Sequence, residues 1–107
     1  MKHYLISLPL PRQGMDAHCY LMTNNPAHVE VAANKLVHSI EQAGGEVVVP
    51  IVLSTPLSSA SARKVRAAVR KISTDRGKTL SEAKNFHYTG WAMPASDPVS
   101  IELMALH

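Results

Sequence analysis

The stretch AHCYLMTNNPAHVEVAANKLVHSIEQAGG, residues 17–45, contains a strand, a helix start and a helix end in succession. Residues 17–23 alternate between two sets of side chains, which is typical of a strand. Asn25 is placed to cap a helix, and Pro26 suits the first helical position because its missing N–H has no partner there. Apolar residues then recur at helical spacing until two glycines end the helix. We therefore expect a strand followed by an amphipathic helix over residues 26–43.

The residues on either side of this unit favour further strands. Residues 3–8 are β-formers ended by Pro9, and we expect them to pair antiparallel with the strand above across a loop from Leu10 to Asp16. The valine-rich run 46–54 also reads as a strand. Pro50 removes one ladder donor from that run, which predicts an edge position or a bulge.

The second half of the chain predicts a second helix and two more strands. The helix follows Thr55-Pro56, and Ser58, Ser59 or Ser61 is placed to cap it. The spacing of Thr79 and Glu82 fits a capping box, which would give a short helical turn. Two further strands, residues 86–93 and 99–106, are expected to form a hairpin across a loop rich in turn formers.

The predicted order ββαβαββ is that of an α+β domain, with a mostly antiparallel or mixed sheet covered by two amphipathic helices. The length of 107 residues fits one domain, residues 1–107, and 46% hydrophobic residues are enough for one core. Trp91 is expected in that core because the chain has one tryptophan and one phenylalanine. Cys19 is the only cysteine and cannot form an intramolecular disulfide, which favours a reducing, cytoplasmic location. No apolar run is long enough to span a membrane, so no membrane partner is expected.

Charge is distributed unevenly along the chain. Residues 63–78 contain seven cations and one acid, a local net charge of +6, whereas the remaining residues carry −3. Such a cluster favours an acidic protein surface or a nucleic acid as partner, because an anion relieves the repulsion between the cations. The alternative is an ordinary solvated helix face. The predicted partner-binding residues are Arg63, Lys64, Arg66, Arg70, Lys71, Arg76 and Lys78.

Within this set, Arg63, Arg66 and Arg70 are spaced by three and four residues and should form one ridge, with Lys64 and Lys71 beside it. Arg12 and Met15 in the first loop offer groups that protein interfaces favour, and we expect a secondary interface there. The three serines before the ridge could hold an anion at the helix start, although serine is also the usual capping residue.

Catalytic and metal-binding patterns are absent from the sequence. It lacks G-x-G-x-x-G, Walker A, H-E-x-x-H, C-x-x-C and G-x-S-x-G motifs. His18 cannot act as the base for Cys19 if both lie in one strand, because their side chains point to opposite faces. None of the histidines has the spacing of paired metal ligands on a helix, although His3, His18 and His87 could meet from different strands. We therefore expect no catalytic residues, no metal and no cofactor.

The preferred hypothesis is a small non-enzymatic binding protein that engages an acidic partner surface through the basic helix, residues 63–78. The partner would be a protein of a nucleic-acid-handling complex, and a specific version is a phage or mobile-element inhibitor that blocks a nucleic-acid-processing complex. Direct nucleic-acid binding is the first alternative, and a small enzyme that uses Cys19 or the histidines is the second. Free strand edges also leave open the pairing of two copies into a homodimer.

Overall fold

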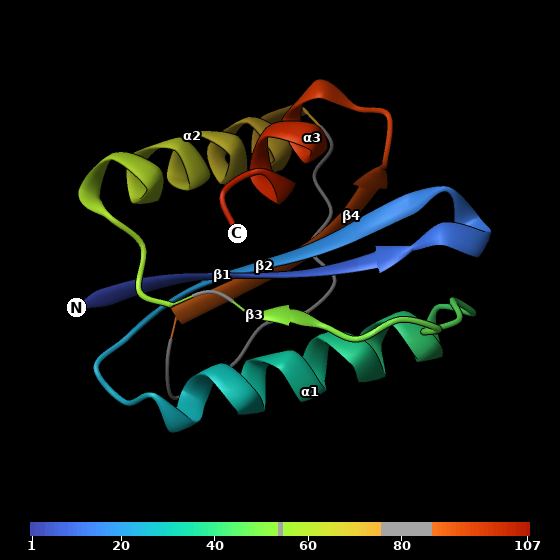
Figure 1. Cartoon of the computed structure of the whole chain (residues 1–107), viewed down its shortest axis with the longest axis horizontal. Helices are drawn as coiled ribbons and strands as arrows, with labels where there is room; N and C mark the ends of the chain where they lie inside the picture. The colour runs from blue at the N-terminus through green and yellow to red at the C-terminus, as the bar shows by residue number, and fades with distance from the viewer. Residues whose placement is uncertain (54, 76–86) are drawn as a thin grey trace.

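The computed structural model describes residues 1–53, 55–75 and 87–107, and its elements alternate between strands and helices (Figure 1). In chain order they are β1 (Lys2–Leu10), a 3₁₀ turn η1 (Pro11–Gln13), β2 (Met15–Thr23), α1 (Ala27–Gln42), β3 (Val52–Leu53), α2 (Ser59–Asp75), β4 (His87–Pro94) and α3 (Pro98–Met104). The chain therefore forms a small compact α+β domain, as predicted. Within the described residues, none of the helices has the length and apolarity needed to cross a membrane.

The strands form one antiparallel sheet in the order β3-β1-β2-β4. Its centre is the pair β1 and β2, whose register runs from Lys2 opposite Thr23 to Leu10 opposite Met15. The predicted antiparallel pairing is confirmed, but both strands are longer and the loop is shorter than expected, because Pro9 continues β1 opposite Asp16. Beyond the two residues that pair with β3, one side of β1 has no strand partner in the described part of the chain, and a proline is tolerated there.

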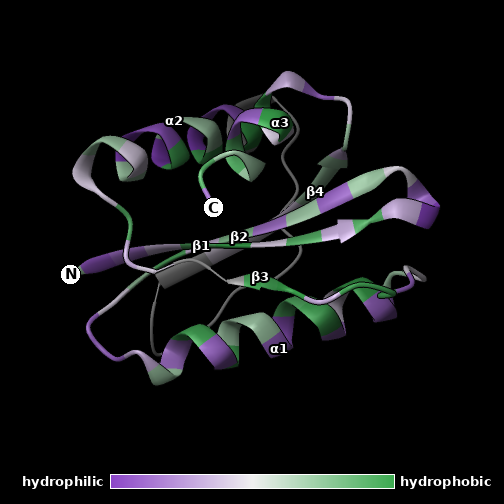
Figure 2. Ribbon diagram, viewed as in Figure 1, coloured by the Kyte–Doolittle hydropathy of each residue, from purple (hydrophilic) through white to green (hydrophobic). Residues whose placement is uncertain are grey.

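Helices cover both faces of the sheet, with α1 on one face and α2 and α3 on the other (Figures 1 and 2). Neighbouring residues of one strand enter different cores: Ile6 packs in the cluster under α1, whereas Leu5 packs in the cluster under α2 and α3. The two central strands are therefore buried on both sides. Trp91 lies in the second cluster and is 2% exposed, which confirms the prediction that it is a core residue.

The strand predicted over residues 46–54 is mostly wrong, because only Val52 and Leu53 join the sheet. The valines before these two residues alternate in burial: Val47 and Val49 pack against the cluster under α1, while Val48 is 41% exposed. Pro50 explains the difference, since it lacks the N–H needed for a ladder. The predicted edge position is confirmed, because β3 is the outermost strand beside β1.

The predicted C-terminal hairpin is also wrong, because α3 stands where its second strand was expected. Asp97 caps this helix by accepting a hydrogen bond from the N–H of Val99 at 2.9 Å, and proline follows at the first helical position. Val99 and Leu103 face the core at helical spacing, whereas Ile101 is 58% exposed. In the described residues the sheet is thus covered by three helices rather than two.

Other predicted helix ends are confirmed. The side chain of Asn25 accepts from the N–H of Ala27 at 3.1 Å at the start of α1. Ser58 accepts from the N–H of Ser61 at 3.1 Å at the start of α2, so Ser58 is the capping serine. After α1, Gly44 has a φ of 87°, a left-handed conformation that glycine adopts at little cost. The capping box predicted at residues 79–82 lies outside the described residues.

Candidate functional site

Three arginines of α2 lie along one side of the helix, where they border two surface hollows. Arg63 and Arg66 line a hollow of about 530 Å³, and Arg66 and Arg70 line a second hollow of about 520 Å³. All three side chains are exposed. Their spacing of three and four residues keeps them on neighbouring turns of one helix face. The ridge expected from the sequence therefore stands between the two hollows, with Arg66 shared by both; we call this surface the arginine ridge.

The remaining predicted cations do not join the arginine ridge. Lys64 and Lys71 are exposed, but they are seven residues apart on another side of α2 and line neither hollow. Arg76 and Lys78 lie outside the described residues. Lys2 at the start of β1, which sequence reasoning did not include, lines the same hollow as Arg63 and adds a fourth cation. The basic segment is thus divided between two sides of its helix.

A hydrogen-bonded aromatic pair lies beside the arginine ridge. His3 lines the first hollow and Tyr20 the second, and Nδ1 of His3 is hydrogen-bonded to the hydroxyl of Tyr20, with the two rings stacked at a centroid distance of 5.8 Å. Burial and the positive charge of Arg66 lower the pKa of His3. Burial raises the pKa of Tyr20, against the opposing effect of Arg66. Both residues therefore stay uncharged near neutral pH and add no negative charge beside Arg66.

Two of the three arginines of the ridge, Arg63 and Arg66, have no acidic partner in the described part of the chain. Among residues 1–53, 55–75 and 87–107, no salt bridge involves Arg63 or Arg66, and the same holds for Lys64 and Lys71. Unpaired guanidinium groups on one helix face give a positive surface potential that attracts anionic partners. The physical basis of the predicted basic site is therefore present in these residues.

The predicted secondary interface has a different character. Both carboxylate oxygens of Glu46 accept from Arg12 at 3.0 Å, so the cation expected to bind a partner is paired within the chain. Met15 lines a smaller hollow of about 190 Å³ together with Ile40 of α1 and Ala92 of β4. These residues share no hollow with α2. The structure therefore separates Arg12 and Met15 from the arginine ridge.

A chain of buried hydrogen bonds crosses the core under α3. It links His107, Ser7, His18, Ser100 and Asp16, each to the next, through contacts of 2.8 Å. Ser100 donates to the Asp16 carboxylate, so its oxygen accepts from Nε2–H of His18. Nδ1 of His18 then accepts from the Ser7 hydroxyl. This relay holds His18 as the neutral tautomer protonated on Nε2.

The relay contains a serine and a base within hydrogen-bond reach, which is the pairing that activates a nucleophile. However, Ser7, His18 and Ser100 are each 0% exposed, so a substrate has no access to the hydroxyl of Ser7 in this structure. We interpret the relay as a polar connection between the sheet, α3 and the residue after it. Sequence reasoning missed it because its members are far apart in the chain, up to 100 residues for Ser7 and His107.

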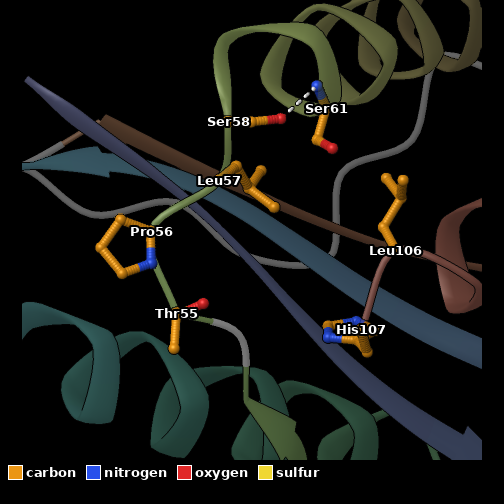
Figure 3. A pocket seen from close by; sticks show the side chains of 7 residues that line it. All are labelled: Thr55, Pro56, Leu57, Ser58, Ser61, Leu106 and His107. Atoms are coloured by element: carbon orange, nitrogen blue, oxygen red, sulfur yellow. Dashed lines mark hydrogen bonds between the residues drawn. The ribbon is translucent and has the colours of Figure 1, made fainter.

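A fourth hollow adjoins the exposed end of the relay. It has a volume of about 380 Å³ and is lined by Thr55, Pro56, Leu57, Ser58, Ser61, Leu106 and His107. Figure 3 shows the segment before α2 on one side of this hollow and Leu106 and His107 on the other. Of the three serines that the sequence offered as an anion site, Ser58 caps α2 by accepting from the Ser61 N–H, whereas Ser59 lines the hollow beside Arg63. No lysine, arginine or acid lines this hollow, so it does not extend the arginine ridge.

The histidines do not form a metal site in the described residues. His3 is bonded to Tyr20 and His18 to two serines, while the side chain of His87 lies outside the described residues. His28 of α1 is hydrogen-bonded to Thr23. No group of three potential metal ligands occurs among the residues that the structure describes.

Cys19 should be inert in the folded protein. Its side chain is 0% exposed and packs under α1, on the face of β2 opposite His18, and burial raises the pKa of its thiol. Because the thiolate is the reactive form, we expect no reaction with a thiol reagent such as DTNB under native conditions and full reaction after unfolding in guanidinium chloride. Native-state labelling at the rate of a small free thiol would contradict this placement.

The arginine ridge with its two hollows is thus the surface whose chemistry most favours a ligand. Comparison of the chain with protein-family models, with curated proteins and with solved structures finds no match, so the argument about function rests on this geometry.

Proposed function

We propose that this protein is a non-enzymatic binding protein that engages an acidic partner surface through α2. The observation that carries the proposal is the arginine ridge: Arg63, Arg66 and Arg70 lie exposed on one side of the helix and border two hollows. Arginine suits this role because its planar guanidinium group binds carboxylates through two parallel hydrogen bonds and keeps its charge at all relevant pH values.

The partner we propose is a protein with an acidic surface, within a complex that handles nucleic acid. Such a complex presents acidic or phosphate-bearing surfaces, and a protein that covers one of them acts by occupancy and needs no reactive group. A phage or mobile-element inhibitor that blocks a nucleic-acid-processing complex is the specific form of this proposal, with action in the cytoplasm. Direct binding of DNA or RNA through the same cations is the competing function.

Charge reversal distinguishes the contribution of the arginine ridge to binding from that of the overall positive charge of α2. The double variant Arg63→Glu/Arg66→Glu should bind fluorescein-labelled poly-glutamate about 30-fold more weakly than wild type, because two attractions of up to about 1 kcal/mol each are replaced by repulsion. Its affinity should also fall less steeply with salt. Fluorescence anisotropy at several salt concentrations measures both quantities.

The matched control is Lys64→Glu/Lys71→Glu, which changes the net charge by the same amount on another side of the helix. Its affinity should fall much less than that of the ridge variant. Equal losses in the two variants would show that only net charge matters, which contradicts the proposed site. A mobility shift with single- and double-stranded DNA and with RNA, run on the same proteins, tests the competing function.

A further inference from the structure

The two hollows beside the arginine ridge have linings that a purely electrostatic contact does not need. Apart from its cations, the first is lined mainly by apolar side chains, those of Met1, Pro56, Leu57 and Ala62. The second is lined by Met22 and Val69 together with Tyr20 and Thr89. Their volumes of about 530 and 520 Å³ fall in the range of ligand pockets. Each hollow therefore offers apolar surface for a group that a partner inserts.

The position of Arg66 joins the two hollows into one composite surface. Its side chain borders both, with Arg63 beside the first and Arg70 beside the second. A partner that reaches the guanidinium of Arg66 has a depression on either side of that contact, lined in part by apolar side chains. Protein interfaces commonly combine this pattern, in which a few anchor side chains fill pockets while charged groups fix the orientation.

We propose that the occupant is an acidic, amphipathic segment of a protein, whose carboxylates meet Arg63 and Arg66 while two of its apolar side chains fill the hollows on either side. This inference rests on the proposed function and assigns the chemistry of the partner segment. The carboxylates give charge complementarity to the ridge. The apolar side chains give the affinity that exposed ion pairs alone do not supply.

The lining favours a peptide over a single-stranded nucleic acid. Single-stranded nucleic acids bind on aromatic faces against which the bases stack. The aromatic ring that borders the second hollow belongs to Tyr20, which is 5% exposed and is stacked with His3, so its face is already covered. The methionines of the hollows are flexible and adapt to apolar side chains of different shape, as in other peptide-binding surfaces.

The test is a selection of random peptides on the immobilised wild-type protein, followed by affinity measurements with the enriched peptides. The enriched peptides should contain aspartate or glutamate together with at least two apolar residues. Their binding should fall about tenfold in each of two variants that fill a hollow without changing charge, Ser59→Trp in the first and Thr89→Trp in the second. The same two variants keep the three arginines, so their binding of poly-glutamate should fall much less than their binding of the enriched peptides.

Replacing the apolar residues of an enriched peptide by alanine should weaken its binding to wild type about tenfold and change its binding to the tryptophan variants much less. Enriched peptides without apolar residues, or tryptophan variants that bind them with unchanged affinity, would overturn the inference while leaving the proposed function intact. If a dT oligonucleotide binds wild type more tightly than every enriched peptide, and Thr89→Trp weakens its binding, the hollows would be assigned to nucleic acid. If Arg63→Glu/Arg66→Glu changes the binding of no probe, the proposed function itself fails.

Discussion

Acidification from about pH 7 to pH 4 is expected to lower the free energy of unfolding by about 3 kcal/mol through His18 alone. Burial, opposed in part by Asp16, lowers the pKa of His18 from its ordinary value of 6.5 to about 4 in the folded protein. The unfolded chain therefore binds more protons than the folded chain between these two values. The stabilising contribution is complete above pH 6.5 and is lost as the pH falls toward 4.

The hydrogen-bonded relay explains why protonation of His18 is costly. A protonated imidazole must donate from both ring nitrogens, so Ser7 would have to accept where it now donates. The Ser7 hydroxyl would then need His107 as an acceptor, although the relay has Nε2 of His107 donating to Ser7. Protonation of both His18 and His107 leaves the Ser7 hydroxyl without an acceptor and places one positive charge on each side of it.

Urea unfolding at a series of pH values measures the decrease in the free energy of unfolding. NMR titration of the imidazole signals shows which histidine causes it. The signals of His18 should stay those of a neutral ring down to about pH 4, whereas an exposed histidine titrates near its ordinary value. His3 and His107, whose pKa values burial also lowers, act in the same direction, and their titrations are followed in the same spectra. A native His18 that titrates near 6.5 would show that the relay does not hold its ring neutral.

The substitution Leu36→Ala should destabilise the protein by about 2–5 kcal/mol. Leu36 is 0% exposed and lies on the face of α1 that packs against the sheet, in a cluster that includes Ile6 and Leu21. Its removal takes apolar surface out of the core and leaves a cavity that the close-packed surroundings fill only in part. Urea unfolding at neutral pH measures the difference from wild type.

The neighbouring substitution Lys35→Ala is the matched control, because Lys35 is exposed on the same helix. Alanine favours a helix at least as well as lysine, so this variant should stay within about 0.5 kcal/mol of wild type. A similar small loss for Leu36→Ala would mean that α1 contributes little to the core. That outcome would contradict the packing of helices on both faces of the sheet.

Capping residues and alternating side chains in the sequence correctly predicted several of the helices and strands in which they occur. Asn25 and Ser58 marked helix starts, and alternation identified β2 and its partner. The pair Asp97-Pro98 carries the same signal as Asn25-Pro26, and it would have identified α3 had it not been interpreted as part of a turn. The alternation over residues 99–106 favoured a strand, yet the same residues also have apolar groups at helical spacing. Local pattern could not decide between these two, because contacts with the rest of the core decide it.

The candidate site was predictable to a similar extent. Spacing along one helix was enough to place Arg63, Arg66 and Arg70 on a common face. The hollows depend on how α2 docks beside the start of β1, the end of β2 and β4, which no local pattern specifies. The contact between His3 and Tyr20 follows from the strand register, which pairs His3 with Met22 and places Tyr20 diagonally opposite. Sequence alternation predicted the strand pair but not this register.

The placement of α1 and α2 on opposite faces of the sheet also separates charge across the described part of the molecule. α2 contains five cations between residues 63 and 71 and one acid, Asp75, and α3 on the same face adds Glu102, whereas α1 contains two glutamates and one lysine. An anionic surface that approaches in solution exerts a torque on such a molecule and turns its α2 side forward before the two touch. The two proteins then need less time to find the orientation in which they dock, so the association rate rises. This increase becomes smaller at higher salt, because dissolved ions screen the electric field.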